Sequence, residues 1–168
     1  EVASVFRKEF SQGDLEVILG VEGKDADAEY VLLNSLMERL LISRSKSGYR
    51  IHDMLKGFFY ERIRASRKAK LHRKLAQRYA MLEEAGALDG MYHYVRGKEP
   101  GKAAGIATVY GEACLAKGHI NDMSHVMEDI ISRTKRPSVE ALVLCGRVRF
   151  ACANIDGAIS ALDAALLG

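Results

Sequence analysis

A dense run of basic side chains is the first feature of this sequence that could carry out a chemical function. Residues 62–78 hold eight lysines and arginines, and three more precede them between residues 44 and 50. Clustered positive charge neutralises phosphates and supports binding to nucleic acid. The same pattern is also typical of a solvated helical face, or of a surface that docks an acidic neighbouring domain. This candidate basic surface comprises Arg44, Lys46, Arg50, Arg62, Arg64, Arg67, Lys68, Lys70, Arg73, Lys74 and Arg78.

A histidine–aspartate pair is the second feature. His52 ends an expected strand, and Asp53 starts the helix after it. The structural interpretation is that Asp53 caps this helix while His52 hydrogen-bonds to the turn. The neighbours of His52 make it the one histidine for which a functional role is also considered.

No catalytic constellation can be assembled from the remaining residues. Residues 97–103 (GKEPGKA) fail as a phosphate loop, because one residue is missing between the glycines and alanine replaces the Ser or Thr that binds magnesium. The other four histidines lack metal-ligand spacing and are expected on the surface or between helices; they are His72, His93, His119 and His125. No nucleophile stands beside a recognisable base. We therefore expect a segment that is not an enzyme and binds no metal or cofactor by itself.

Composition places the chain among ordinary folded proteins. Its 168 residues are 48% hydrophobic and 28% charged, which suits one large domain or two small ones. Two prolines, no tryptophan and many Ala, Leu, Lys and Arg residues favour a mostly helical fold. The net charge of +3 conceals an asymmetry: acids and bases number eight and three in residues 1–30, three and thirteen in residues 31–80, and eleven and nine in residues 81–168.

The cysteines and the hydropathy pattern indicate the cellular compartment of the protein. Three cysteines cannot all pair, and Cys145 and Cys152 lie too far apart along one helix for a disulfide. No run approaches 18 apolar residues, so no transmembrane helix and no membrane partner are expected. We expect a cytoplasmic protein. Because the chain starts with Glu1 instead of Met and an apolar run leads into Gly168, we also expect an internal piece of a longer protein.

The first 52 residues predict three helices and a hairpin. A short helix is expected over residues 2–10, a second after Ser11 or Asp14, and a third opened by Asp25 or Asp27 after a turn at residues 20–24. The third helix has one apolar face, formed by Leu33, Leu36, Met37, Leu40 and Leu41. Residues 42–52 then read as strand, polar turn and strand. Three helices followed by a two-stranded wing is the winged-helix arrangement.

Two further helices follow the wing. Asp53 is expected to cap the first, whose apolar stripe comprises Met54, Leu55, Phe58, Phe59 and Ile63. The second carries Leu71, Leu75, Tyr79 and Leu82 inward and the basic cluster on its outer face. A break is expected at residues 86–90. The predicted organisation is a winged-helix domain at 1–66, a basic connecting helix at 67–85 and helical repeats at 86–168.

An internal repeat marks the last 80 residues. Gly111 is followed by Met123, Met127 and Ile130, and Gly146 by Ala158, Leu162 and Ala165, at an offset of 35 residues. This offset is close to the 34-residue tetratricopeptide period, and the second set resembles that repeat well. Residues 92–104 are similar to an earlier, degenerate helical pair. The predicted fold is therefore mainly all-α, with a winged helix followed by a tetratricopeptide-like, right-handed array of helical hairpins.

In this order, the elements resemble one family, the STAND class of signal-transduction ATPases. That class includes NB-ARC resistance proteins, apoptotic-protease activators and bacterial activators of the maltose-regulon type. Ile51-His52-Asp53 is similar to its Met-His-Asp motif, with Ile51 as a conservative departure. Residues 3–7 (ASVFR) and 32–41 (LLNSLMERLL) also look like its winged-helix domain, and residues 92–130 look like the first hairpins of its sensor.

The resemblance implies a role for His52. In that family the histidine contacts the β-phosphate of ADP and holds the closed, inactive state, while Asp53 would orient it or cap the helix. The phosphate loop and catalytic residues would lie in an upstream nucleotide-binding domain, which would share its ADP or ATP with this segment. The implied partners are that domain and a protein or small-molecule signal on the repeats.

A second function stays open, namely a DNA-binding winged-helix regulator with an interaction array. The third helix discriminates between the two, because it would be the one that reads the major groove. Its outer positions are Asn34, Ser35, Glu38 and Arg39, with a single base among them. Reading helices present more Arg, Lys, Asn or Gln to base edges and phosphates, so the nucleotide-state lever is favoured.

Overall fold

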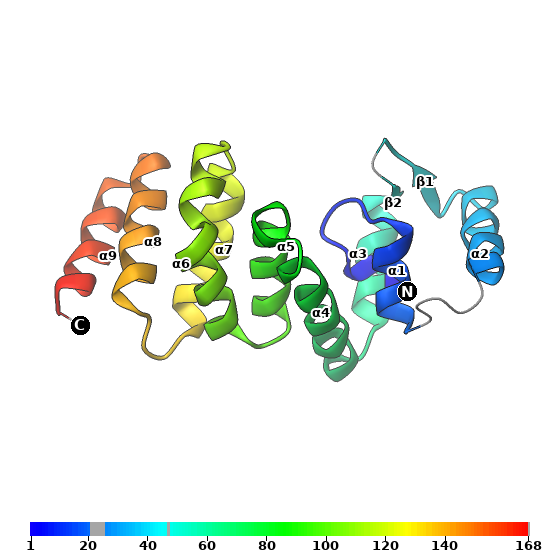
Figure 1. The fold of residues 1–168 in the computed structure, drawn as a ribbon, viewed down its shortest axis with the longest axis horizontal. Coiled ribbons are helices and arrows are strands. Elements are labelled where there is room, and N and C mark those ends of the chain that lie inside the picture. Colours follow the sequence, from blue (N-terminus) through cyan, green and yellow to red (C-terminus); the bar gives the residue numbers. More distant parts are fainter. Residues whose placement is uncertain (21–25, 47, 168) are drawn as a thin grey trace. The chain divides into compact units, whose positions relative to one another are not determined.

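The chain forms two compact units, one from Glu1 to Leu75 and one from Ala76 to Gly168. This computed structural model describes residues 1–20, 26–46 and 48–167. The described residues are mainly helical, as the sequence predicts, with one two-stranded sheet near the N-terminus (Figure 1). The division falls inside helix α4 (Ala65–Ala80). No helix in the described ranges is both long and apolar enough to cross a bilayer.

The N-terminal unit begins with a short 3-10 helix, η1 (Val2–Val5), where a helix over residues 2–10 was expected. The expectation is wrong beyond Val5 because the chain turns extended at Phe6. Phe6 and Phe10 are buried and stack with ring centroids 4.4 Å apart. Phe10 also pairs with Tyr49 by two backbone hydrogen bonds, of 2.9 and 2.8 Å. Core packing and this bridge therefore outweigh helix propensity here.

Helix α1 (Gln12–Leu19) is capped by Ser11, one of the two residues that the sequence offered as its cap. The Ser11 hydroxyl accepts a hydrogen bond from the Asp14 backbone amide, and the Asp14 carboxylate accepts one from the Ser11 amide. This is a capping box, which satisfies two amides that the helix leaves unpaired. Gly20 ends the helix with φ of +74°, a conformation that suits glycine. The rest of the turn expected at residues 20–24 lies outside the described residues.

Helix α2 (Ala26–Glu38) follows. Asp25 lies outside the described residues, and Asp27 is already inside the helix. Leu33 is buried as predicted, but Leu40 is 83% exposed, so its expected place on the buried face is wrong. The reason is that α2 ends at Glu38 and Leu40 adopts φ of +57° in the turn that closes the helix. There the Leu41 amide donates to the Leu36 carbonyl.

The expected hairpin is present. Strands β1 (Ile42–Arg44) and β2 (Tyr49–Ile51) are antiparallel, and Ile42 lies opposite Ile51 with both side chains buried. Through the bridge at Phe10, the segment before α1 joins the open edge of this hairpin. The sheet thereby links the start of the unit to the strand that leads into His52.

Helix α3 (Asp53–Arg62) departs from its predicted apolar stripe. Met54 is 81% exposed and Phe58 51% exposed, whereas Ile63, just past the helix, is buried. The predicted stripe is wrong at these two residues because the side of α3 that is partly buried carries Leu55 and Phe59 instead. The 3-10 helix η1 packs against α3. The guanidinium of Arg62 instead covers the Phe58 ring, 3.7 Å from its centroid.

Helix α4 buries Leu71 and Leu75 as predicted, whereas Leu82 lies beyond its end and is exposed. Within the N-terminal unit, the Lys74 ammonium donates to the carbonyls of Val17 and Ile18, at 3.4 and 3.3 Å. These carbonyls are in the last turn of α1, where helix acceptors lack partners and where positive charge is favourable. Lys74 therefore fixes α4 against α1.

Helix α5 (Glu83–Arg96) runs through the break expected at residues 86–90, so that prediction is wrong. Gly86 and Gly90 are not helix breakers here but sites of close approach. A methyl group at Gly86 would collide with the Tyr79 carbonyl, and one at Gly90 would lie 3.3 Å from Ile106 Cδ1 of the next helix. Because these two glycines have no side chain, neighbouring backbone and side-chain atoms pack directly on the backbone of α5.

The C-terminal unit continues with α6 (Pro100–Ala116), α7 (Ile120–Arg133), α8 (Val139–Ala151) and α9 (Ile155–Leu167). Each helix packs against the next, and α6 also packs against α8 (Figure 1). Residues 92–104 form the end of α5 and the start of α6, which pack together. Buried residues from α5 to α9 form one continuous core.

The 35-residue offset reappears in the backbone of this unit. Helices α6 and α8 end at Ala116 and Ala151, and helices α7 and α9 begin at Ile120 and Ile155. The turns match as well: Gly118 has φ of +81°, and Ala153, 35 residues later, has φ of +59°. These four helices therefore form two hairpins with the same connection.

Candidate functional site

His52 lies at the corner between β2 and α3. It is the residue before the helix, its side chain is exposed, and it makes no capping hydrogen bond to α3. Asp53 is the first residue of the helix instead of its cap, and its carboxylate accepts a hydrogen bond from Arg50 at 3.3 Å. The structural interpretation of both residues is therefore wrong in detail, because neither side chain caps α3.

Two basic residues flank this corner in the sequence. Arg50 precedes His52 on β2, and Lys56 follows it by one helical turn. The Lys56 ammonium donates to the Arg7 carbonyl at 2.6 Å, and burial lowers the pKa of Lys56, against the opposing effect of Asp53. The unpaired amides at a helix start carry partial positive charge. An exposed imidazole at such a corner can bind an anionic group that approaches the start of the helix.

The predicted basic surface is divided. Arg44, Lys46 and Arg50 are exposed on or near the hairpin, and Arg62, Arg64, Arg67 and Lys70 are exposed on or near α3 and α4. The remaining four members are partly buried, so α4 does not carry the whole cluster on an outer face. These four are Lys68, Arg73, Lys74 and Arg78.

Two of the partly buried bases show why the prediction fails. Lys68 lies 3.6 Å from the Glu61 carboxylate and 4.3 Å from the Tyr60 ring centroid, and Lys74 holds the end of α1 as described above. Both long side chains use their charge inside the N-terminal unit. These two side chains therefore contribute to packing within the unit instead of forming a surface for a ligand.

The other histidines lie where the sequence predicts. His72 and His93 are fully buried between helices, whereas His119 and His125 are exposed. His72 Nε2 lies 3.0 Å from the Tyr60 hydroxyl, and His93 stacks on Tyr79 with ring centroids 5.5 Å apart. Within residues 1–20, 26–46 and 48–167, no three His, Cys, Asp or Glu side chains form a group that could hold a metal ion.

The segment that fails as a phosphate loop is the turn between α5 and α6. Lys98 adopts φ of +65° there, and the Lys102 ammonium pairs with the Glu99 carboxylate at 2.9 Å. The three cysteines are free thiols: Cys114 and Cys145 are buried, as expected of packing residues, but Cys152 is exposed at the end of α8. Burial raises the pKa of Cys114 and of Cys145.

The C-terminal unit contains a hollow that the sequence interpretation missed. It has a volume of about 500 Å³ and is lined mainly by α8 and α9. Its lining includes Gly146 and Ala158 together with the larger apolar side chains of Phe150, Ile155 and Ile159. Leu162 was assigned to a packing position; it does approach Gly146 closely but stays 40% exposed. The missed signal is the spacing of large apolar residues along α9.

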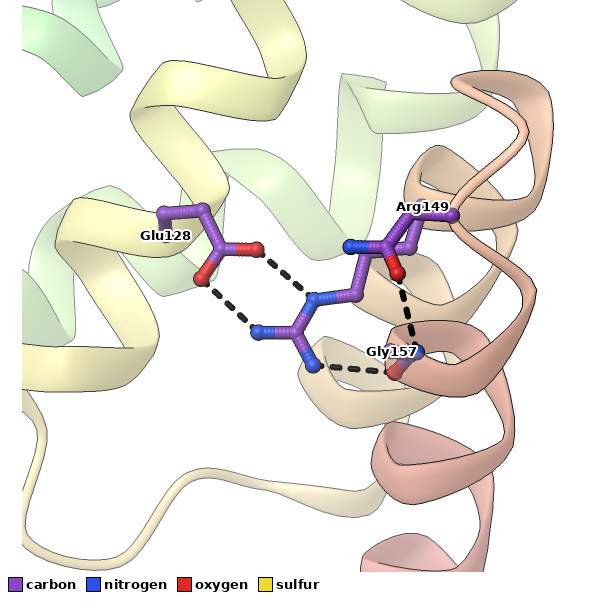
Figure 2. A network of polar contacts seen from close by, with 4 residues as sticks. Glu128, Arg149 and Gly157 are labelled. Carbon is purple, nitrogen blue, oxygen red and sulfur yellow. Dashed lines mark hydrogen bonds and ion pairs between the residues drawn. The ribbon is translucent and has the colours of Figure 1, made fainter.

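Arg149 on α8 joins this helix to α7 and α9 (Figure 2). Its guanidinium forms two parallel 2.7 Å hydrogen bonds to the Glu128 carboxylate on α7 and a 3.0 Å bond to the Gly157 carbonyl on α9. The paired charges lower the pKa of Glu128 and raise that of Arg149. Such a bidentate arrangement is specific for arginine with a carboxylate.

Comparison with known proteins leaves the chain without a match: no family model, curated protein or solved structure is similar to it.

Proposed function

We propose that this chain is a regulatory segment of a STAND-type signalling ATPase. In this proposal, the N-terminal unit is a winged-helix lever that senses ADP or ATP held by an upstream nucleotide-binding domain. The C-terminal unit is a tetratricopeptide-like arm for a signal or partner. The segment itself is not catalytic, and the protein works in the cytoplasm.

The observation that carries the proposal is the exposed His52 side chain at the start of α3. It is held at a corner between the hairpin and a helix, with Arg50 and Lys56 on either side in sequence. An imidazole there can donate a hydrogen bond to a phosphate brought by another domain. A rigid-body movement of a few ångströms would break that bond, as a two-state switch requires.

The order of elements supports the winged-helix part. Helices α1 and α2 are followed by the β1–β2 hairpin, and the Phe10–Tyr49 bridge ties the first segment to the wing. The lever interpretation is favoured over DNA binding by the surface of α2. Val31 is 65% exposed and Leu32 46% exposed. An apolar surface of this kind suits contact with a protein domain better than contact with DNA phosphates.

The test uses the complete protein encoded by the gene. His52→Ala is compared with His119→Ala, a matched change at another exposed histidine that precedes a helix without a side-chain cap. A hydrogen bond to a charged group contributes about 1.5–3 kcal/mol, so loss of His52 should speed ADP release roughly 10- to 100-fold. Release of a fluorescent ADP analogue gives the rate.

Three results would overturn the proposal. One is unchanged ADP release in His52→Ala, and another is a gene that encodes no phosphate loop upstream of Glu1. The third is sequence-dependent submicromolar binding of duplex DNA by this chain at physiological salt, measured by fluorescence anisotropy. That result would favour the DNA-binding regulator instead, with Arg44, Lys46 and Arg50 on the wing as its phosphate contacts.

A further inference from the structure

Four exposed basic side chains lie where α3 ends and α4 begins, and we call them the α3–α4 patch. Arg62 is the last residue of α3, and Arg64 lies in the connection to α4. Arg67 and Lys70 belong to the first two turns of α4. Within the ranges that the structure describes, none of the four forms an ion pair with an acid. Their charge is therefore available to a ligand.

The local backbone directs these side chains outward. Ile63, between Arg62 and Arg64, has an extended backbone and is 4% exposed, so its side chain points into the unit and those of its two neighbours project away from it. The Arg64 carbonyl accepts a hydrogen bond from the amide four residues later, so Arg64 is held against the first turn of α4. Arg64, Arg67 and Lys70 then follow at steps of three residues, a spacing that makes successive side chains neighbours on a helix surface.

The surrounding sequence does not balance this charge. Residues 54–80 contain nine lysines and arginines and a single acid, Glu61. The Glu61 carboxylate lies 3.6 Å from the Lys68 ammonium, so a base outside the patch already accompanies it. Unbalanced positive charge attracts polyanions. Three of the four patch residues are arginines, whose planar guanidinium groups bind phosphate oxygens in pairs.

An exposed aromatic ring borders the patch. Phe58 is 51% exposed and precedes Arg62 by one helical turn, and the Arg62 guanidinium lies over its ring, 3.7 Å from the centroid. Phe59 packs edge-on against Phe58 with ring centroids 5.3 Å apart. Unpaired nucleic-acid bases stack on aromatic rings and on guanidinium planes. Acidic side chains do not need such a flat surface, so the pair of Phe58 and Arg62 favours a nucleic acid over an acidic polypeptide.

We propose that the α3–α4 patch binds single-stranded nucleic acid with little sequence preference. The phosphates contact Arg64, Arg67 and Lys70, and one base stacks on the pair of Phe58 and Arg62. A single strand fits because its bases are accessible for stacking, whereas the bases of a duplex are stacked on each other. The inference goes beyond the proposed function and does not involve His52, so either can fail without the other.

The test titrates the whole chain into fluorescein-labelled oligothymidylate and oligouridylate of about 15 nucleotides, with fluorescence anisotropy as the readout. A saturable complex is expected with both, because DNA and RNA share the phosphates and bases that the patch contacts. If only one of them binds, the patch is retained and that nucleic acid is its ligand. Three or four phosphate contacts give a slope of about −2 to −3 when the logarithm of the binding constant is plotted against that of the salt concentration.

One matched pair of variants tests the charge. Arg64→Gln combined with Arg67→Gln should reduce the magnitude of the salt slope by about 1.4, because two phosphate contacts are lost. Lys135→Gln combined with Arg136→Gln removes two exposed bases from the C-terminal unit and should leave the slope unchanged. Both double variants change the net charge equally, so the comparison isolates the position of the bases.

A second pair tests the stacking. Phe58→Leu keeps an apolar side chain but removes the aromatic face, and it should weaken binding about fivefold without changing the salt slope. Phe150→Leu is the control, since Phe150 is 67% exposed on α8 and should not contribute. Circular dichroism checks that each variant keeps its helix content, which the exposure of the substituted side chains leads us to expect.

Four outcomes would overturn the inference. One is no saturable binding of either oligonucleotide with up to about 100 µM chain at about 50 mM salt. Another is a salt slope that the two double variants reduce equally, and a third is binding that Phe58→Leu leaves intact. The fourth is tighter binding of an oligoglutamate peptide of equal charge, which would make an acidic polypeptide the occupant.

Discussion

Replacing Arg149 with alanine should destabilise the C-terminal unit substantially. Two hydrogen bonds of 2.7 Å to the Glu128 carboxylate and one of 3.0 Å to the Gly157 carbonyl would be lost together. The Arg149 side chain is only 20% exposed, but Glu128 is 49% exposed, so solvent screens the pair. An ion pair of this kind contributes at most about 1 kcal/mol, and the carbonyl bond about 1 kcal/mol more.

We therefore expect Arg149→Ala to lower the free energy of unfolding by about 2 kcal/mol, which corresponds to a roughly 30-fold change in the unfolding equilibrium. Urea denaturation followed by far-ultraviolet circular dichroism measures the loss, and hydrogen exchange assigns it to helices α7, α8 and α9. Arg147→Ala is the matched control. Arg147, on the same helix as Arg149, pairs with Glu112 of α6 at 2.6 Å. Both side chains of this pair are more than half exposed, so about 0.5 kcal/mol or less should be lost.

The effect should depend on pH in a defined direction. Arg149 lowers the pKa of Glu128 in the folded state below its unfolded value of about 4.3. The pair's contribution to the free energy of unfolding is therefore complete above that unfolded pKa, and it is lost as the pH falls through the lower pKa of the folded state. The coupling between Arg149→Ala and Glu128→Gln in a double-mutant cycle should be close to 1 kcal/mol at pH 7 and should shrink below about pH 4. A loss no larger than that of Arg147→Ala, or coupling that persists unchanged in acid, would refute the reasoning.

Three other variants or measurements test the packing of the same unit. Ala153→Gly should raise the free energy of unfolding by about 0.5–1 kcal/mol in urea denaturation, because φ of +59° strains alanine but not glycine; lower stability would contradict this. Gly111→Ala should destabilise the unit by about 1–3 kcal/mol through overlap with the leucine of α8, whereas Gly105→Ala, with open space around it, should stabilise it by up to about 1 kcal/mol. A thiol reagent should label Cys152 within seconds and the two buried cysteines far more slowly, because burial also raises the pKa of those thiols; three equal rates would argue against the fold.

Local sequence signals predicted the parts of the fold that depend on few residues. Ser11 and Asp14 were the two candidate caps of α1, and the structure uses both of them in one capping box. The hairpin followed from two short apolar strands around a polar turn. Cap and turn preferences arise from hydrogen bonds within a few residues, so no knowledge of the rest of the chain is needed.

Predictions that depended on which neighbour a residue meets were less successful. Gly86 and Gly90 were interpreted as a helix break, but tight packing on their bare backbone keeps α5 intact. Met54 and Phe58 fit an apolar stripe, but the structure exposes them. Periodicity shows that a face is apolar without showing whether any other element covers it.

The candidate site also contains one feature that local sequence predicted and others that depend on distant neighbours. His52 could be singled out because its neighbours in sequence form a recognisable pattern, and its exposure is compatible with a contact outside the chain. The network of Arg149, Glu128 and Gly157 joins residues up to 29 positions apart on three helices, so composition and spacing gave no sign of it. Large apolar residues recur along α9 at steps of four and three, but this spacing does not show that Leu162, which was assigned to a packing position, stays 40% exposed.

The repeated turn in the C-terminal unit has a geometric consequence. The amides of His119 and Asn154 donate to the carbonyls of Cys114 and Arg149, five residues back in each case, and a left-handed residue precedes each amide. The chain therefore leaves α6 and α8 in the same direction, although glycine makes one turn and alanine the other. The turn inside each hairpin is consequently specified by main-chain hydrogen bonds and one left-handed residue. Side chains can then differ from one hairpin to the other without altering the way in which the second helix of each follows the first.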